Sequence, residues 1–405
     1  MPDMLADMTT YHCPVDGTRS PTTALTWCCP ACGGPWDLDF APARGVGPNA
    51  LSGRANSLWR YEEFLPLAAP AISLGEGRTP LVPLTDTVSA KLDYLMPTLS
   101  FKDRGAVMLV ELARRLGPDR VVADSTGNAG TSVAAYCARA GLACTVYVPE
   151  GTSPKKTEQI RAHGAHLVTV PGGREATALA ARAAADGPGV FYASHVFNPY
   201  FLHGTKTYVY ELWEDLGGRL PDALAVPVGN GTLLLGAALA TAELHALGLI
   251  GTRPRLIAVQ AEAVSPLATA ELHALGLIGT RPRLIAVQAE AVSPLAAAFH
   301  ADADDLPPAD PAAVASPTLA EGIAIPRPPR ARQILAAVRA SGGTFLTVPE
   351  DRIREAQRDL AARGFFVETT GVACWAAVRE GGGDAVPGSV VVPLCGAGLK
   401  TGMAG

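Results

Sequence analysis

The sequence lacks any apolar run of the roughly 18 residues that a membrane-spanning helix requires. Its first residues, Met1-Pro2-Asp3, lack the basic and then apolar order of a secretion signal. Positive charge is not in excess either, since the net charge at pH 7 is −5. We therefore expect a cytoplasmic protein that has neither a membrane nor a nucleic acid as its partner.

The length and the apolar content are sufficient for a large core. The chain has 405 residues, of which 48% are hydrophobic, and this length suggests about two to three domains. Strand-like segments at 121–123, 144–149 and 166–170 alternate with helical segments. The alternation predicts a doubly wound parallel sheet, in which ligands collect at the carboxyl ends of the strands.

Four of the eight cysteines crowd between Cys13 and Cys32. Cys29 and Cys32 form an intact C-x-x-C knuckle, whereas Asp16 stands where the first knuckle should have its second cysteine. The pattern predicts a small zinc ribbon with Cys13, Asp16, Cys29 and Cys32 as ligands in a reducing compartment. Cys28 is close enough to replace Asp16, and a turn-rich segment without metal is the alternative.

Lys102 lies between Phe101 and Asp103, at the start of a helix expected over residues 106–115. A buried ammonium is unfavourable unless it is neutralised or used covalently. Lys102 is therefore a candidate for a covalent bond to an aldehyde cofactor. The alternative is a solvated lysine on an amphipathic helix, and the motifs further along the chain favour the first interpretation.

Two later motifs lie at the carboxyl ends of expected strands. In residues 226–232, V-P-V-G-N-G-T, glycines allow the backbone to close around an anion at the start of a helix. In the second, Cys395 follows the strand-like run V-V-V-P at 390–393. Both sites therefore have the position that ligand-binding residues take in a parallel sheet.

Residues 241–268 recur without change as residues 269–296, a period of 28. Two copies are too few for a stacked repeat architecture, which needs at least about three. Identical copies would face different neighbours in different positions of a sheet. We predict that only one of the two L-I-A-V-Q strands fits the sheet and that the other leaves it as an insertion.

Five motifs in this order resemble the threonine synthases and their relatives, which are pyridoxal-phosphate enzymes of the tryptophan-synthase-β type. They are P-T-L-S-F-K-D-R-G (97–105), D-S-T-G-N-A-G (124–130), N-P-Y-F-L-H-G-T-K-T (198–207), P-V-G-N-G-T (227–232) and C-G-A-G-L-K (395–400).

The resemblance implies fold type II, with two doubly wound three-layer α/β/α domains behind the zinc-ribbon-like segment. The expected parts are that segment (1–40), a large cofactor-binding domain (41–115 and 190–405, which includes both repeat copies) and a small α/β domain (116–189). It also implies pyridoxal 5′-phosphate as cofactor, a small amino acid as substrate and a homodimer.

The resemblance assigns roles to particular residues. Lys102 would carry the cofactor covalently and then move protons, and Asn128 would hydrogen-bond its phenolic oxygen. Cys395 would face the pyridine nitrogen, where a thiol, unlike a carboxylate, favours elimination and replacement at the side chain. The phosphate would be held by Gly229, Asn230, Gly231 and Thr232, and the substrate by Ser125, Thr126 and Asn198.

The substrate itself is where the sequence departs from the family. Phe201 stands where threonine synthases often have an arginine that binds the substrate phosphate, and such a partner contributes roughly 1.5–3 kcal/mol. The motif set favours a threonine synthase that acts on O-phosphohomoserine. Phe201 favours a serine or threonine dehydratase or another β-elimination or replacement enzyme. A third possibility is an inactive, cofactor-binding interaction protein.

Overall fold

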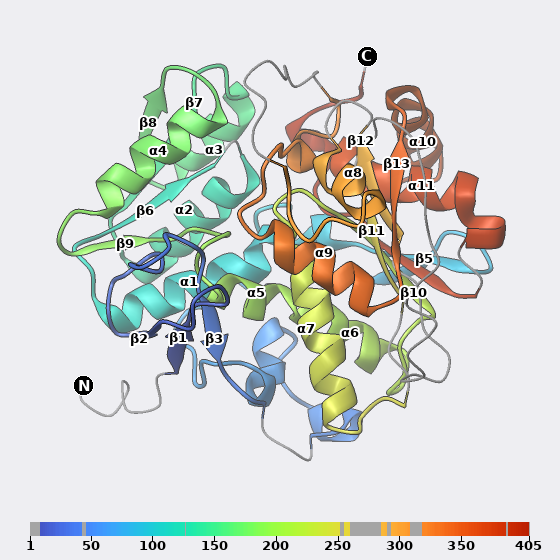
Figure 1. Ribbon diagram of the computed structural model, residues 1–405, viewed down its shortest axis with the longest axis horizontal. Coiled ribbons are helices and arrows are strands. Elements are labelled where there is room, and N and C mark those ends of the chain that lie inside the picture. Colours follow the sequence, from blue (N-terminus) through green and yellow to red (C-terminus); the bar gives the residue numbers. More distant parts are fainter. Residues whose placement is uncertain are drawn as a thin grey trace. The chain divides into compact units, whose positions relative to one another are not determined.

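The computed structural model describes residues 9–42, 46–125, 127–251, 255–259, 285–289, 293–307, 318–385 and 388–404. The chain divides into two units (Figure 1). Unit 1 contains Met1–Arg78 and Leu95–Glu211, and unit 2 contains Thr79–Tyr94 and Leu212–Gly405. Among the described residues, no helix combines the length and the apolar character that crossing a membrane demands.

Unit 1 contains two sheets. The N-terminal sheet has three antiparallel strands in the order β2-β1-β3, and the second has four parallel strands in the order β8-β7-β6-β9. The strands are β1 Thr10–His12, β2 Arg19–Pro21, β3 Asp37–Asp39, β6 Arg120–Asp124, β7 Cys144–Pro149, β8 His166–Val170 and β9 Val190–Tyr192. The helices are α1 Lys102–Leu116, α2 Asn128–Ala140, α3 Pro154–Ala162, α4 Arg174–Ala185, α5 Tyr200–Thr205 and α6 Thr207–Asp215, of which α6 continues into unit 2.

The four-stranded sheet is buried on both faces. Val146 and Val148 of β7 pack with Ile160 of α3 on one face, and Val122 of β6 packs with Ala181 of α4 on the other. The alternation of side chains along a strand explains how one sheet contributes to two cores. Because the strand order reverses between β6 and β9, their carboxyl ends form a topological switch point, where ligands bind in sheets of this kind.

Unit 2 has a seven-stranded sheet in the order β12-β13-β11-β10-β14-β5-β4, parallel except for the β4–β5 pair. Helix α9 lies against both α7 and α8, and α10 packs with α11. The strands are β4 Leu81–Pro83, β5 Val88–Lys91, β10 Ala223–Pro227, β11 Arg255–Val259, β12 Ile285–Ala289, β13 Thr344–Val348 and β14 Val390–Pro393. The helices are α7 Thr232–Ala246, α8 Pro294–His300, α9 Ala331–Ala340, α10 Glu350–Ala362 and α11 Thr369–Ala385.

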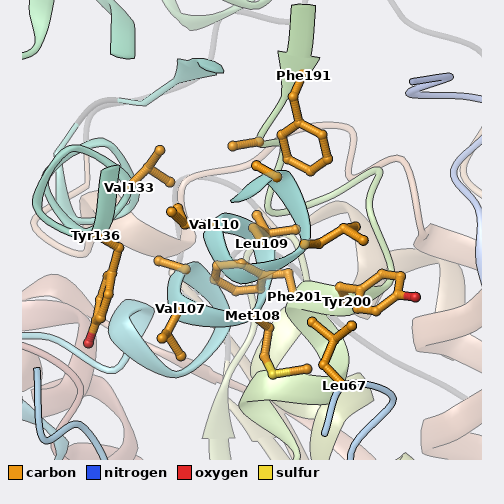
Figure 2. Packing of buried hydrophobic residues seen from close by; sticks show 14 of the residues in the cluster. Leu67, Val107, Met108, Leu109, Val110, Val133, Tyr136, Phe191, Tyr200 and Phe201 are labelled. Atoms are coloured by element: carbon orange, nitrogen blue, oxygen red, sulfur yellow. The ribbon is translucent and has the colours of Figure 1, made fainter. Parts of the chain in front are cut away.

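The units do not follow the domain boundaries expected from the sequence. Helix α1, expected in the large domain, belongs to unit 1 because it packs on α2 and α5. A Cβ atom at Gly204 of α5 would lie 2.0 Å from the carbonyl oxygen of Arg104, so the two backbones touch. Figure 2 shows Phe201 of α5 among the buried side chains of α1. Residues 190–211 also belong to unit 1, since β9 pairs with β6.

Both copies of the repeat contribute a strand to the sheet of unit 2. Ala258 of β11 and Ala286 of β12 hold the same position in their copies, and both pair with Phe345 of β13. The prediction that one strand leaves the sheet is therefore wrong, because β13 accepts the two identical strands in the same register. Most of the remaining repeat lies outside the described residues.

Candidate active site

Lys102 is the first residue of α1, as the sequence predicts. Its side chain is half-buried, and the ammonium nitrogen lies 3.7 Å from the centre of the Phe101 ring. The preceding turn ends at Leu99, whose φ of 62° is in the left-handed region. A non-glycine residue there is under strain, and the Leu99 N–H donates to the carbonyl of Met96 at 2.8 Å. The backbone before Lys102 is thus held in one uncommon shape.

Asp103 fixes the start of α1 against α2. Its carboxylate accepts hydrogen bonds from the Thr98 N–H at 2.7 Å, the Thr98 hydroxyl at 2.5 Å and the Ser132 hydroxyl at 2.6 Å. Asp103, Thr98 and Ser132 are all buried. The bland interpretation of Asp103 as a solvated charge is therefore excluded, and the network joins the start of α1, where Lys102 lies, to the first turns of α2.

The loop from β6 to α2 lies at the switch point of the four-stranded sheet. The Ser125 hydroxyl accepts the Gly127 N–H at 3.0 Å, and α2 begins at Asn128, which is half-buried. Thr126 lies outside the described residues. The structure therefore places Ser125 and Asn128 where a ligand of this sheet is expected.

Two buried hydroxyl groups in this region have no hydrogen-bond partner in the described part of the chain. They are Oγ of Ser100, two residues before Lys102, and Oγ1 of Thr131, three residues after Asn128. Buried polar groups are nearly always satisfied. Such unpaired groups on both sides of Lys102 and Asn128 fit a polar molecule bound here.

Asn198 has a different environment from the one expected of a substrate ligand. Its side chain is buried, its Oδ1 accepts the Tyr200 N–H at 3.0 Å, and its Nδ2 donates to the Tyr11 hydroxyl at 3.3 Å. These bonds shape the turn that starts α5. Phe201 is also fully buried, and its ring occupies the space where a Cβ atom at Gly105 would be, 2.4 Å away.

Two charged residues near this region were not singled out from the sequence. Lys156 of α3 is buried, and its Nζ would lie 3.3 Å from a Cβ atom at Gly127. Its position four residues before the buried Ile160 was the available signal, because helix residues i and i+4 share a face. His195 follows β9 and is likewise buried, with its pKa well below the usual value through desolvation and then through the positive charges of Lys102 and Arg174.

In unit 2 the glycine-rich loop and Cys395 follow adjacent parallel strands. Gly229, Asn230 and Gly231 lead from β10 into α7, and Cys395 follows β14, which pairs with β10. Gly231 has a φ of 73° and caps α7. A Cβ atom at Gly229 would lie 2.6 Å from the carbonyl oxygen of Gly322, so only glycine fits.

The start of α7 fits a phosphate group. A helix cannot satisfy the N–H groups of its first turn from within, and its dipole favours an anion there. α7 has 15 residues, and Thr232 is its first. Cys395 is fully buried, and its thiol donates to the carbonyl of Pro393 at 3.5 Å. The strand order of the unit 2 sheet also reverses between β10 and β14, which makes their ends a second switch point.

Comparison with known proteins agrees with these features. The family model described as "Pyridoxal-phosphate dependent enzyme" matches residues 72–275 and 271–396. The chain therefore belongs to this family of pyridoxal-phosphate dependent enzymes. It has their fold type II and is a lyase that depends on pyridoxal phosphate.

Within the family, the chain is similar to proteins named threonine synthase. That of Methanosarcina acetivorans is 29% identical over 91% of this chain and 86% of the relative. That of Mycobacterium leprae is 32% identical over 84% of this chain and 87% of the relative. A solved threonine deaminase from the organism abbreviated T.th. has a TM-score of 0.61 and 27% identity and covers 79% of this chain and 92% of its own. Maize serine racemase, with a TM-score of 0.62 and 17% identity over 80% of this chain and 90% of its own, shares the fold.

Proposed function

We propose that the protein converts O-phosphohomoserine to threonine and phosphate by elimination at the γ carbon followed by addition of water at the β carbon. The observation that carries the proposal is the position of Lys102, held by the buried Asp103 network beside the loop at a sheet switch point. Similarity to threonine synthases along most of the chain supports the substrate.

In this proposal the cofactor supplies a ring that accepts the electrons left when a proton is removed from carbon. Lys102 bonds the cofactor aldehyde and then takes and returns the protons at the α, β and γ carbons of the substrate. Asn128 donates to the phenolic oxygen, and Cys395 faces the ring nitrogen. The phosphate is held by Gly229, Asn230, Gly231 and Thr232.

The substrate carboxylate is assigned to Ser125 and Thr126, whereas Asn198 acts through the turn that it shapes. Lys156 is proposed as the cation for the second anionic group of the substrate, because a buried ammonium beside Gly127 lies next to the carboxylate loop. This assignment would compensate for Phe201, which is fully buried and carries no charge.

The second candidate is a dehydratase that releases ammonia from threonine or serine. It is favoured by Phe201 and by the structural likeness to threonine deaminase. Such a substrate has one anionic group, so this enzyme would not require a second cation.

The proposal includes a zinc ion held by Cys13, Asp16, Cys29 and Cys32, with no part in the reaction. We also place the protein in a reducing compartment, the cytoplasm, since all eight cysteines are free of disulfides. A homodimer is proposed from the family resemblance alone, and light scattering during gel filtration tests it.

Two assays test the function. Borohydride reduction followed by mass spectrometry of peptides locates the pyridoxyl group, which we expect on Lys102. Phosphate release from O-phosphohomoserine is then measured beside ammonia release from threonine and serine. Lys102→Ala should abolish the adduct and the activity, while Lys155→Ala, which changes an exposed lysine, should retain both. Ammonia release without phosphate release would favour the dehydratase, and an adduct on another residue would refute both candidates.

A further inference from the structure

The two N-terminal knuckles have the same backbone geometry, although only one carries two cysteines. The N–H of Cys13 donates to the carbonyl of Thr18, and that of Cys29 donates to the carbonyl of Gly34, five residues on in each case. The glycine four residues after each of these cysteines, Gly17 or Gly33, donates back to the cysteine carbonyl. The loss of a cysteine at position 16 has therefore not changed the turn.

The Asp16 carboxylate occupies the place that the second thiolate occupies in the intact knuckle. Oδ1 of Asp16 accepts the Thr18 N–H at 2.9 Å, just as Sγ of Cys32 accepts the Gly34 N–H at 3.4 Å. Each acceptor is two residues before its donor. Amide bonds of this kind orient the ligands of a metal site, and Asp16 keeps the arrangement with oxygen in place of sulfur.

The four ligand atoms have the spacing of a tetrahedral site. One atom each from Cys13, Asp16, Cys29 and Cys32 lies within 4.8 Å of all the others. The sulfurs of Cys13 and Cys32 are 3.4 Å apart, as are Oδ2 of Asp16 and Sγ of Cys29. With zinc bonds of about 2.3 Å to sulfur and about 2.1 Å to oxygen, tetrahedral ligands lie about 3.5–3.8 Å apart. Cys28 is not in this cluster, which decides between the two ligand sets left open by the sequence.

The residues next to these ligands hold the turn before α5. The ring of Tyr11 stacks on Trp36 at 5.7 Å and meets Tyr200 edge-on at 6.4 Å. The Trp36 N–H donates to the carbonyl of Phe197 at 3.1 Å, and Asn198 donates to the Tyr11 hydroxyl. Tyr11 precedes the ligand Cys13 by two residues in the chain. Contacts from both knuckle strands thus end on residues 197–200.

The contacts continue from this turn to the helix that begins with Lys102. Phe201 follows Tyr200 in α5, and its ring lies against Gly105 of α1. We propose that a zinc ion bound by three thiolates and Asp16 fastens the 197–200 turn through Tyr11 and Trp36, so that loss of the metal loosens the seat of α5 on α1. This inference rests on the zinc site included in the proposed function.

The first experiment measures the metal. Purified protein should contain about one zinc ion per chain, as a closed structural site holds, and the cobalt-loaded protein should show the visible bands of four-coordinate cobalt with thiolate ligands. Cys29→Ser and Asp16→Ala should lose the metal, Asp16→Cys should bind it more tightly, and Cys28→Ser should keep it. Equal loss in Cys28→Ser and Asp16→Ala, or a disulfide in place of metal, would overturn the site.

The second experiment measures the coupling by hydrogen exchange of the full chain. Removal of zinc by a chelator should cost the Trp36 amide and the amides of residues 200–205 their protection, and readdition of zinc should restore it. Tyr11→Phe should keep the metal yet lose part of the protection, because only the bond to Asn198 is removed. Unchanged exchange in the zinc-free protein would overturn the coupling. The borohydride adduct on Lys102 is measured in the same samples, so a failure of the proposed catalysis is recognised separately.

Discussion

The carboxylate of Asp103 accepts a hydrogen bond from the Ser132 hydroxyl at 2.6 Å, and both groups are fully buried. The bond joins the first turn of the helix that begins with Lys102 to the helix that begins with Asn128. Because Thr98 donates to the same carboxylate twice, three buried donors depend on one side chain. The placement of Lys102 follows from this network rather than from α1 alone.

Replacement of this carboxylate should be costly. Asp103→Asn presents an amide donor to a group of donors, and we expect a loss of about 2–4 kcal/mol in the free energy of unfolding, measured with denaturant. The adduct on Lys102 should decrease as well. Asp86→Asn changes an exposed carboxylate and should stay within about 0.5 kcal/mol of the wild type. A neutral effect of Asp103→Asn would mean that the network does not position α1.

The buried ion pair of Arg104 and Glu211 offers a double-mutant cycle. Their side chains are fully buried and bonded twice, at 2.6 and 2.9 Å. Arg104→Met should cost about 3–5 kcal/mol of unfolding free energy, since Glu211 would be left as an unpaired buried charge. Addition of Glu211→Gln should recover part of the loss. If the two changes were additive in denaturant melts, the pair would have no coupling.

Stability should fall as the pH is lowered through the usual pKa of histidine. Burial lowers the pKa of His195 and His203 well below 6.5, so both are neutral in the folded protein and gain a proton on unfolding. Their contribution is therefore fully present above about pH 6.5 and is lost as the pH falls toward the folded pKa values, by up to about 1.4 kcal/mol per pH unit for each. His203→Gln should flatten the profile between pH 5 and 6.5. Identical profiles of the variant and the wild type would contradict the assignment.

Lys156 distinguishes the two candidate substrates. Lys156→Gln removes a buried ammonium beside Gly127, and with O-phosphohomoserine we expect KM to rise about tenfold or more, as loss of a charged hydrogen bond implies. The KM for threonine or serine should change less. Lys155→Gln, an exposed neighbour, is the control. An equal rise for all three substrates would assign Lys156 to the shared carboxylate.

Deletion of one repeat copy yields the same polypeptide whichever copy is removed, because the copies are identical. The remaining strand would still pair with β10 and β13, as β11 does now. The two family matches also meet inside the second copy, at residues 271–275. We therefore expect an unchanged or higher melting temperature and an unchanged cofactor absorbance. A lower melting temperature would show that the second strand stabilises the sheet.

Local sequence patterns predicted much of the chain. Lys102 at a helix start, the glycine loop before α7, the Cys395 turn and the four metal-ligand residues are each defined within a few neighbouring residues. Turn chemistry, helix propensity and the alternation of strands and helices act over that range. The fold class and the family followed from the order of such segments.

Burial and strand pairing were decided only by the tertiary structure. Nothing near Asp103 or Arg104 in sequence indicates that they are fully buried, since their partners Ser132 and Glu211 lie 29 and 107 residues away. The same holds for the pairing of both repeat strands with Phe345. The sequence by itself determined which local segments exist and what chemistry they carry. The tertiary structure decided which of them meet, because the free energy of burial and pairing depends on neighbours that are distant in the chain.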